Sequence, residues 1–186
     1  MRTQATIGLT LLLTLGGCAT PTTTTPDAGP AVSIINSLSF EHAMNGKRDG
    51  LRSAWPADKL AGSTEHFPIA QVKQCTPAGA CSWGVLKAQR SFGKVEPVPG
   101  GVRVELTVTI DVDRSQKAVS GGEQAAMAIP ADVAALQAKR TERRAVVLEY
   151  GKVMRVDMNY GIRYEVCALR LDAAREAVDK CPIEYF

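Results

Sequence analysis

Several residue types are scarce in this sequence, and each scarcity argues against a class of function. Histidine occurs only at His42 and His66, which leaves few imidazole ligands for a zinc centre. The formal net charge is only +3 over 186 residues, so the chain lacks the basic excess of a nucleic-acid-binding protein. No apolar run reaches the roughly 20 residues that a membrane-spanning helix needs. We therefore predict no nucleic-acid partner, no cofactor and no metal site.

Catalytic motifs are also scarce. The chain has no G-x-S-x-G setting for a nucleophilic serine. Each histidine directly follows a glutamate, Glu41 or Glu65, and adjacent side chains point in different directions on a helix or a strand. The glycine pairs Gly100–Gly101 and Gly121–Gly122 lack the lysine of a phosphate-binding loop and are interpreted as turns. We therefore predict a protein that is not an enzyme and has no catalytic residues.

A calcium-loop pattern begins at Asp111 but is not completed. Asp111, Asp113 and Ser115 take the first, third and fifth positions of such a loop. The sixth position needs a glycine and the twelfth a bidentate glutamate, but Gln116 and Gly122 stand there. The segment is therefore interpreted as the polar end of a strand that runs into a turn.

The first 17 residues have the composition of a secretory leader. Arg2 is their only charged residue, and an apolar segment from Ile7 to Leu15 follows it. This segment is too short to remain in a bilayer as a spanning helix. Gly16 and Gly17 then precede Cys18, and small residues at that place suit a peptidase cleft. We predict that residues 1–17 are a signal peptide that is removed.

The stretch Leu15-Gly16-Gly17-Cys18 resembles the lipobox of bacterial lipoproteins. In that family a small residue precedes an invariant cysteine, which becomes the lipid-bearing first residue of the mature chain. The resemblance implies that Cys18 carries palmitate-type acyl chains, and two or three such chains anchor a protein stably at about 0.8 kcal/mol per buried methylene. Because Ala19 rather than aspartate follows the cysteine, the resemblance further implies the outer membrane, with the protein facing the periplasm.

Threonine and proline dominate the next segment. Residues 19–31 contain Pro21, Pro26 and Pro30 and show no apolar period, so they are predicted to form an extended spacer that reaches up to ~40 Å. The predicted organisation is a signal peptide over 1–17, a lipidated cysteine with its tether over 18–32, and a single periplasmic domain over 33–186.

The four remaining cysteines form an even set in a chain that is predicted to be exported. An oxidising compartment favours disulfides, and three connectivities are open to four cysteines. We favour Cys75 with Cys81 and Cys167 with Cys181, because each pair closes a local loop that contains turn-forming or helical sequence. The absence of any C-x-x-C pair disfavours zinc as the alternative.

Two regions have the alternating pattern of β-strands. From Val102 to Val112 apolar residues alternate with charged and threonine residues, and the preceding "VPGG" fits a type II turn. Together with the segment before the turn, this predicts a hairpin over residues 82–113. Residues 145–171 predict three further strands with turns at Gly151 and Gly161, and a parity change within "IRYEVCALRL" predicts a bulge or a strand buried on both faces.

Helices are predicted in three places. Pro130 to Arg144 has a proline at the first helical position and basic residues in the last turn. A shorter helix is predicted from Asp172 to Asp179, and one helix within Val32 to Leu60, where the period is mixed. The predicted fold is α+β, an antiparallel sheet of about five strands with helices packed on one face, and the alternative is an all-β sandwich.

These observations favour a binding protein. We expect a membrane-anchored envelope lipoprotein that binds or scaffolds another envelope component, most simply a protein. The alternative is a periplasmic inhibitor or immunity protein that acts against a cell-wall-degrading enzyme. The predicted binding residues are Trp83 and Arg103 on the hairpin, since aromatic and arginine side chains are frequent anchors of protein interfaces, although Trp83 next to Cys81 also suits a core position.

Overall fold

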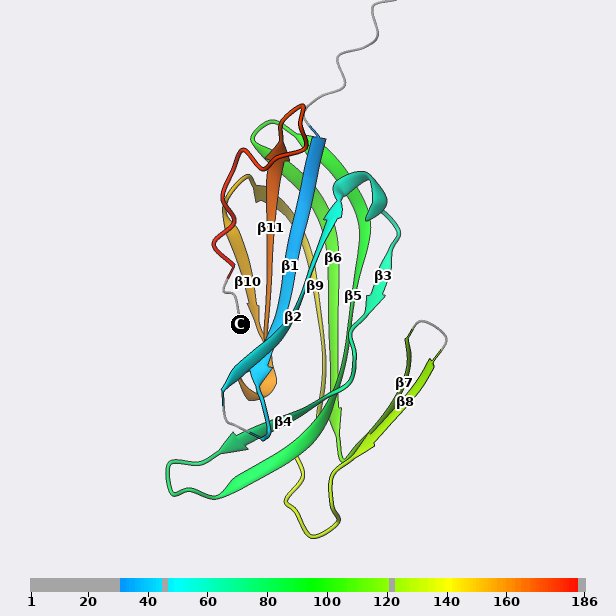
Figure 1. Cartoon of the computed structure of the whole chain (residues 1–186), viewed down its shortest axis with the longest axis vertical. Coiled ribbons are helices and arrows are strands. Elements are labelled where there is room, and N and C mark those ends of the chain that lie inside the picture. Colours follow the sequence, from blue (N-terminus) through cyan, green and yellow to red (C-terminus); the bar gives the residue numbers. More distant parts are fainter. Residues whose placement is uncertain (1–30, 45–46, 121–122, 184–186) are drawn as a thin grey trace, which may run out of the picture.

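The computed structural model describes residues 31–44, 47–120 and 123–183. Within them the chain forms two antiparallel sheets that pack face to face (Figure 1). The first sheet contains, in spatial order, β10 (Val153–Asp157), β11 (Arg163–Leu171), β1 (Ala31–Glu41) and β2 (Arg48–Pro56). The second contains β3 (Thr64–His66), β5 (Cys81–Val98), β6 (Gly101–Asp113) and β9 (Ala138–Glu149), and β4 (Ala70–Cys75) also pairs with β5. Two short 3-10 turns are η1 (Ala57–Lys59) and η2 (Asn159–Gly161).

The core lies between the two sheets. On β6 the inward residues from Val102 to Val112 are each at most 1% exposed, and the residues between them face outward. From the opposite sheet, Tyr164 and Val166 of β11 are fully buried against the same core. Burying each of these side chains contributes about 1.5–3 kcal/mol. The predicted alternation of β6 is therefore confirmed, and its inward residues form one row of the sandwich interior.

The predicted α+β class is wrong, and the all-β alternative fits. Among the described residues there is no α-helix. The segment predicted as a helix from Pro130 to Arg144 instead enters β9, whose residues pair with β6 from Ala138↔Val112 to Glu149↔Gly101. Alanine, arginine and glutamate favour helices locally, but the unpaired edge of β6 requires a hydrogen-bonding partner, and that tertiary demand prevails over local propensity.

The two other predicted helices are also replaced. The segment from Asp172 to Asp179 forms turns, in which the Asp172 carboxylate accepts the N–H groups of Ala174 and Glu176 at 2.9 and 2.8 Å. The positive φ of 67° at Arg175 is incompatible with helix continuation. Within 32–60 the chain forms β1 and β2, and the second half of β1 is buried on both faces, which hides its alternation.

The hairpin and the later strands agree with the sequence. β5 and β6 form the hairpin predicted over 82–113, with Gly100 at φ +79° in the turn. The parity change in β11 had two predicted explanations, a bulge or burial on both faces. The second is correct, because β11 is buried on both faces. The outer face of β11 is covered near Cys167 by the C-terminal segment, whose Ile183 is 2% exposed.

Both predicted disulfides are present. Cys75 pairs with Cys81 across the β4–β5 turn, and Cys167 pairs with Cys181. The second bridge fastens the C-terminal segment to β11. No helix in the described part of the chain combines the length and the apolar character that crossing a membrane requires.

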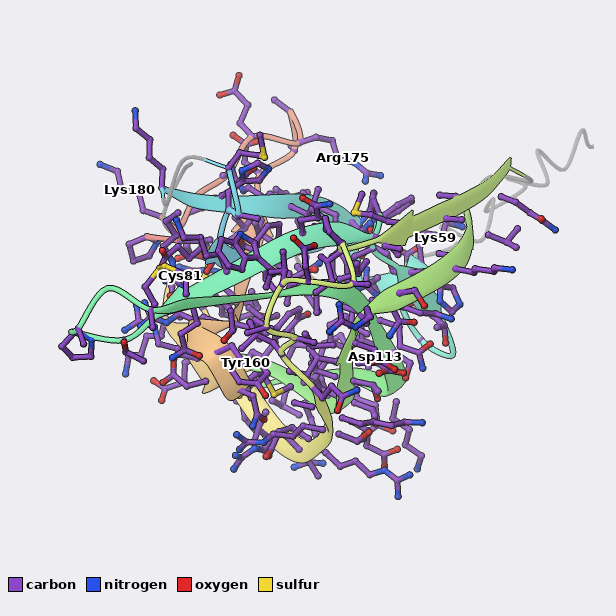
Figure 2. The ribbon with its side chains drawn as sticks, turned by 90° about the horizontal axis from the view of Figure 1, so that it is seen from below. Lys59, Cys81, Asp113, Tyr160, Arg175 and Lys180 are labelled. Atoms are coloured by element: carbon purple, nitrogen blue, oxygen red, sulfur yellow. A yellow bond between two sulfur atoms is a disulfide. The ribbon has the colours of Figure 1, made fainter. Side chains whose placement is uncertain are left out.

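The sandwich has two distinct ends. Ala31, the first described residue, pairs with Leu171 at the upper end in Figure 1. The opposite end, called here the distal end, contains the Cys75–Cys81 turn, the loop over residues 129–137 and the base of the hairpin formed by β7 (Ser115–Ser120) and β8 (Glu123–Ala128). Seen from below in Figure 2, the Cys81 end of β5 and this hairpin leave the molecule on opposite sides.

Candidate interaction arm at the distal end

The hairpin of β7 and β8, called here the arm, stands outside both sheets (Figure 1). It begins where β6 ends, because Asp113 terminates that strand: its Oδ1 accepts the N–H of Arg114 and, at 3.1 Å, the side-chain amide of Gln137. These hydrogen bonds hold the pKa of Asp113 below its ordinary value, with the Arg114 N–H as the largest cause. The segment is thus a strand end, as interpreted, but a single bend at Arg114 leads directly into β7 in place of a turn.

The base of the arm is clamped to the 129–137 loop. The guanidinium of Arg114 donates to the carbonyl oxygen of Pro130 at 2.6 Å and to that of Val133 at 3.0 Å. The N–H of Ile129 donates to the carbonyl of Arg114 at 2.9 Å. Because both ends of the arm are held, its direction relative to the sandwich is set by the fold.

The strands of the arm pair only with each other. Their register runs without a shift from Ser115↔Ala128 to Ser120↔Glu123. In an antiparallel ladder, opposite residues alternate between hydrogen-bonded and non-hydrogen-bonded pairs. The N–H of Ile129 donates to the carbonyl of Arg114, so these two residues form a hydrogen-bonded pair. The next hydrogen-bonded pairs are therefore Gln116 with Met127 and Ala118 with Ala125. The backbone groups left facing outward belong to residues 115, 117 and 119 of β7 and 124, 126 and 128 of β8.

The two faces of the arm differ in exposure. On one face Gln116, Ala118 and Met127 are partly buried, and Ala125 is exposed. The opposite face is exposed and consists mainly of small or apolar side chains with one lysine, namely Ser115, Lys117, Val119, Gln124, Ala126 and Ala128. Val119 is 61% exposed although it is β-branched and apolar. A surface of this kind on a projecting ribbon suits contact with another protein.

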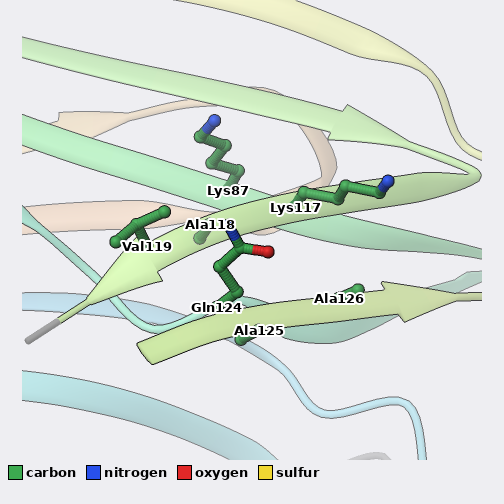
Figure 3. Close-up of a pocket in the computed structure, with 7 residues that line it drawn as sticks. All are labelled: Lys87, Lys117, Ala118, Val119, Gln124, Ala125 and Ala126. Carbon is green, nitrogen blue, oxygen red and sulfur yellow. The ribbon is translucent and has the colours of Figure 1, made fainter. Parts of the chain in front are cut away.

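A groove separates the arm from β5. Its volume is about 370 Å³, and Lys87 of β5 forms one side while the arm forms the other (Figure 3). The arm side is lined by methyl groups of Ala118, Val119 and Ala126 and by the polar ends of Lys117 and Gln124. The groove is therefore largely apolar with cations at its margin, which suits an uncharged or acidic segment of a partner.

A second hollow lies on the other side of the arm. Its volume is about 270 Å³, and Met127 of β8 meets Phe40, His42, Leu51 and Ile69 there. The Nδ1 atom of His42 accepts the N–H of Met44 at 3.2 Å, so this nitrogen is engaged in a local turn. Met127 thus faces the sandwich across this hollow.

The predicted binding residues do not share a surface. Arg103 lies beside the β5–β6 turn, where it pairs with Glu96 and forms an exposed ion pair at 4.0 Å. Trp83 lies near the other end of β5, roughly 40 Å away along an extended strand. It is half-buried: its backbone bonds to Ala134 and Leu136, and Lys73 lies 6.0 Å from its ring. Their roles in binding stay predictions.

The predicted lipidation site, Cys18, lies outside the described residues. Among the residues that are described, no three histidine, cysteine or acidic side chains gather as a metal site would require.

One buried polar cluster belongs to the fold rather than to a site. Arg90 projects from β5 into the core, is 1% exposed and forms an ion pair with Glu65 of β3. Tyr164 is also fully buried, and desolvation raises the pKa of its hydroxyl far above the ordinary value. That shift is opposite to what a proton-transfer group needs near neutral pH.

The arm is not among the strands predicted from the sequence, although the sequence contains a signal for it. Gly121 and Gly122 were interpreted as a turn, and a Gly-Gly pair between two short alternating segments also indicates a two-residue hairpin. The flanking segments are rich in alanine and glutamine, which have low strand propensity, and this obscured the pattern. In comparisons with known proteins, no family model, no curated protein and no solved structure matches the chain.

Proposed function

We propose that this chain is a non-enzymatic lipoprotein that is anchored in the outer membrane through Cys18 and binds another envelope protein with its arm. The observation that carries the proposal is the arm itself: a clamped two-stranded ribbon outside the sandwich, with an exposed apolar face and a groove beside it. A ribbon of two strands adds little to the stability of the core. A role in recognition accounts for its exposure.

The position of the arm supports this function. The chain enters the sandwich at Ala31, and the arm starts at the distal end and projects sideways from the sandwich (Figure 1). A tether attached at Cys18 that reaches up to ~40 Å would hold the domain clear of the bilayer, with the base of the arm at the end farthest from the tether. Restriction to one membrane surface also raises the effective concentration of the arm near other envelope proteins.

The chemistry of the groove supports binding over catalysis. Methyl groups of alanine and valine make up most of the arm side, and the polar groups are two lysines and one glutamine. Apolar contacts of this kind gain free energy from area removed from water, while the lysines add charge complementarity toward an acidic partner segment.

Site-specific photocrosslinking in intact envelopes tests the proposal. A photoreactive amino acid at Val119 should give a discrete crosslinked protein, because this side chain is exposed on the arm. The matched control is the same amino acid at Ala145, which is exposed on β9 outside the arm. Crosslinks of equal yield at both positions, or none at Val119, would contradict the proposal.

The identity of the crosslinked protein distinguishes a scaffolding function from the alternative of an inhibitor or immunity protein. A structural envelope protein would support binding or scaffolding. A cell-wall-degrading enzyme would support the alternative of an inhibitor or immunity protein, and the purified chain should then reduce the activity of that enzyme.

A further inference from the structure

We propose that two copies of this chain pair through the outer edges of their β8 strands, so that two arms form one continuous four-stranded antiparallel sheet. This inference goes beyond the proposed function, which concerns the face of the arm and a different protein. It rests on the backbone of β8, on the side chains that flank its edge, and on the fit of that edge to itself.

The outer edge of β8 offers unpaired backbone groups. The hydrogen bond from Ile129 to Arg114 sets the alternation in the arm, and it leaves the N–H and C=O groups of Gln124, Ala126 and Ala128 directed away from β7. β7 lies nearer to β5, and β8 is the outer strand of the arm (Figure 1). The edge of β8 is thus the accessible one.

This edge lacks the features that usually prevent strand pairing. Proteins protect exposed edges with lysine, proline, bulges or a covering segment. Lys117 occupies the edge of β7, whereas β8 has one charged residue, Glu123, at its first position, and Gln124 to Ala128 are uncharged. The pairing of β7 with β8 also runs without a bulge. From Gln124 to Ala128, therefore, no charge, proline or bulge opposes the addition of a strand.

The edge of β8 is complementary to a second copy of itself. In a two-fold antiparallel register centred on Ala126, Gln124 faces Ala128 of the other copy and Ala125 faces Met127. In each strand, three residues have backbone N–H and C=O groups that point away from β7. In this register each of them lies opposite such a residue of the other copy, which allows about six backbone hydrogen bonds. The two Glu123 residues are not opposite each other in this register, because each is opposite Ile129 of the other copy, and the small alanine side chains permit close approach.

The gain from pairing supports a second copy as the occupant. Two-stranded ribbons are at best marginally stable in water, and sheets of three or more strands with a shared face are more stable. A two-fold dimer adds two strands to each arm in one step and covers the outer edge of both β8 strands, so it does not propagate further. The result would be a single exposed face twice as wide as that of one arm.

Proline variants of the purified full chain in detergent micelles test this inference by sedimentation. Ala126→Pro removes an outward N–H from β8 and leaves the bonds between β7 and β8 in place, since this N–H does not point toward β7. The matched control, Lys117→Pro, removes an outward N–H from β7 instead. We expect a dimer for the natural chain, at least about a tenfold rise in its dissociation constant for Ala126→Pro, and little change for Lys117→Pro.

A cysteine variant provides a second readout that does not depend on a proline. Opposed hydrogen-bonded residues of an antiparallel ladder have Cα atoms about 5.5 Å apart, which is within the range of a disulfide. Ala126→Cys should therefore crosslink two copies on mild oxidation, and Ala145→Cys on β9 should not.

Three outcomes would overturn the inference: a monomeric natural chain up to about 0.1 mM, equal weakening by both proline variants, or equal crosslinking by both cysteines. Sedimentation of the purified chain measures self-pairing alone. Failure here is therefore distinguishable from failure of the Val119 crosslinks in envelopes, which test the proposed function.

Discussion

The guanidinium of Arg90 lies 2.8 Å from the carboxylate of Glu65, and this ion pair sits at the edge of the core between the two sheets. Arg90 also donates to the Ser63 hydroxyl and lies 4.8 Å from the Phe92 ring. Glu65 in turn accepts the Ser53 hydroxyl of β2 at 3.0 Å. The pair therefore connects β5 of one sheet to β2 of the other through a continuous chain of polar contacts.

Removal of Glu65 should destabilise the domain strongly. Glu65→Ala leaves the buried Arg90 cation without its counter-charge, and loss of one partner of a buried pair costs about 3–5 kcal/mol. The control is Glu96→Ala, because Glu96 forms an exposed pair with Arg103 that is worth about 0–1 kcal/mol. Urea unfolding followed by tryptophan fluorescence measures both variants. Equal stabilities of the two variants would show that the pair contributes nothing specific.

The Cys167–Cys181 bridge should stabilise the fold more than the Cys75–Cys81 bridge. The first joins residues 14 positions apart and the second residues 6 positions apart. On the chain-entropy model these loops correspond to about 3 and 2 kcal/mol respectively. Paired replacement of each bridge by alanines, followed by thermal unfolding, should give the larger loss of melting temperature for Cys167 and Cys181. The reverse order would exclude loop entropy as the main source of the stabilisation.

The attachment of the C-terminal segment should weaken in acid. The carboxylate of Asp179 accepts three hydrogen bonds from Arg170, two from the guanidinium at 3.0 and 2.8 Å and one from the backbone N–H at 2.9 Å. Arg170 holds the pKa of Asp179 below its ordinary value of 3.8, chiefly through the side-chain bonds. A lowered folded-state pKa contributes stability that is present above the unfolded-state pKa and is lost as the pH falls through the folded-state pKa.

The corresponding experiment compares the natural chain with Asp179→Asn. The variant should be less stable near neutral pH, and the difference should shrink as the pH falls below 3.8 and Asp179 becomes protonated in the folded state. Asp58→Asn is the control, since Asp58 is exposed at the surface. A stability difference that does not change with pH would assign the effect to packing of the segment instead of its charge.

Cys18 should be the first residue of the mature chain and should carry acyl chains. Mass spectrometry of the protein from membranes should find a diacylated or triacylated Cys18, and Cys18→Ser should prevent the modification and release or stall the protein. An unmodified mature terminus at another residue would contradict both the anchor and the predicted outer-membrane location.

The local sequence pattern is sufficient to predict a strand that has one buried face and adjoins a turn with distinctive residues. The β5–β6 hairpin was predicted because β6 alternates strictly and Gly100 follows Pro99. The same turn already implied that Arg103 lies near it and Trp83 far from it, so the separation of these two residues was available from the hairpin register. The disulfides were predicted because each pair is close in sequence and export favours oxidation.

Local pattern failed where contacts distant in sequence decide the structure. The first half of β9 contains lysine, arginine and glutamate, which suit a helix, and only its pairing with the edge of β6 makes it a strand. In β1 the second half is buried on both faces, so no amphipathic period marks it. The Arg90–Glu65 pair joins residues of two strands, and nothing in the sequence around either residue indicates that they meet.

The central claim is that the arm is the binding surface of an anchored domain, and the affinity of the crosslinked envelope protein for an armless variant tests it most directly. Replacement of residues 115–128 by Asn-Gly closes the chain with a two-residue turn on the hydrogen-bonded pair of Arg114 and Ile129. Retention of both disulfides and of the melting temperature would show that the sandwich remains folded. The account predicts a loss of affinity of at least about 100-fold, as expected when an interface loses its main contacts. An unchanged affinity of the folded armless variant would contradict it.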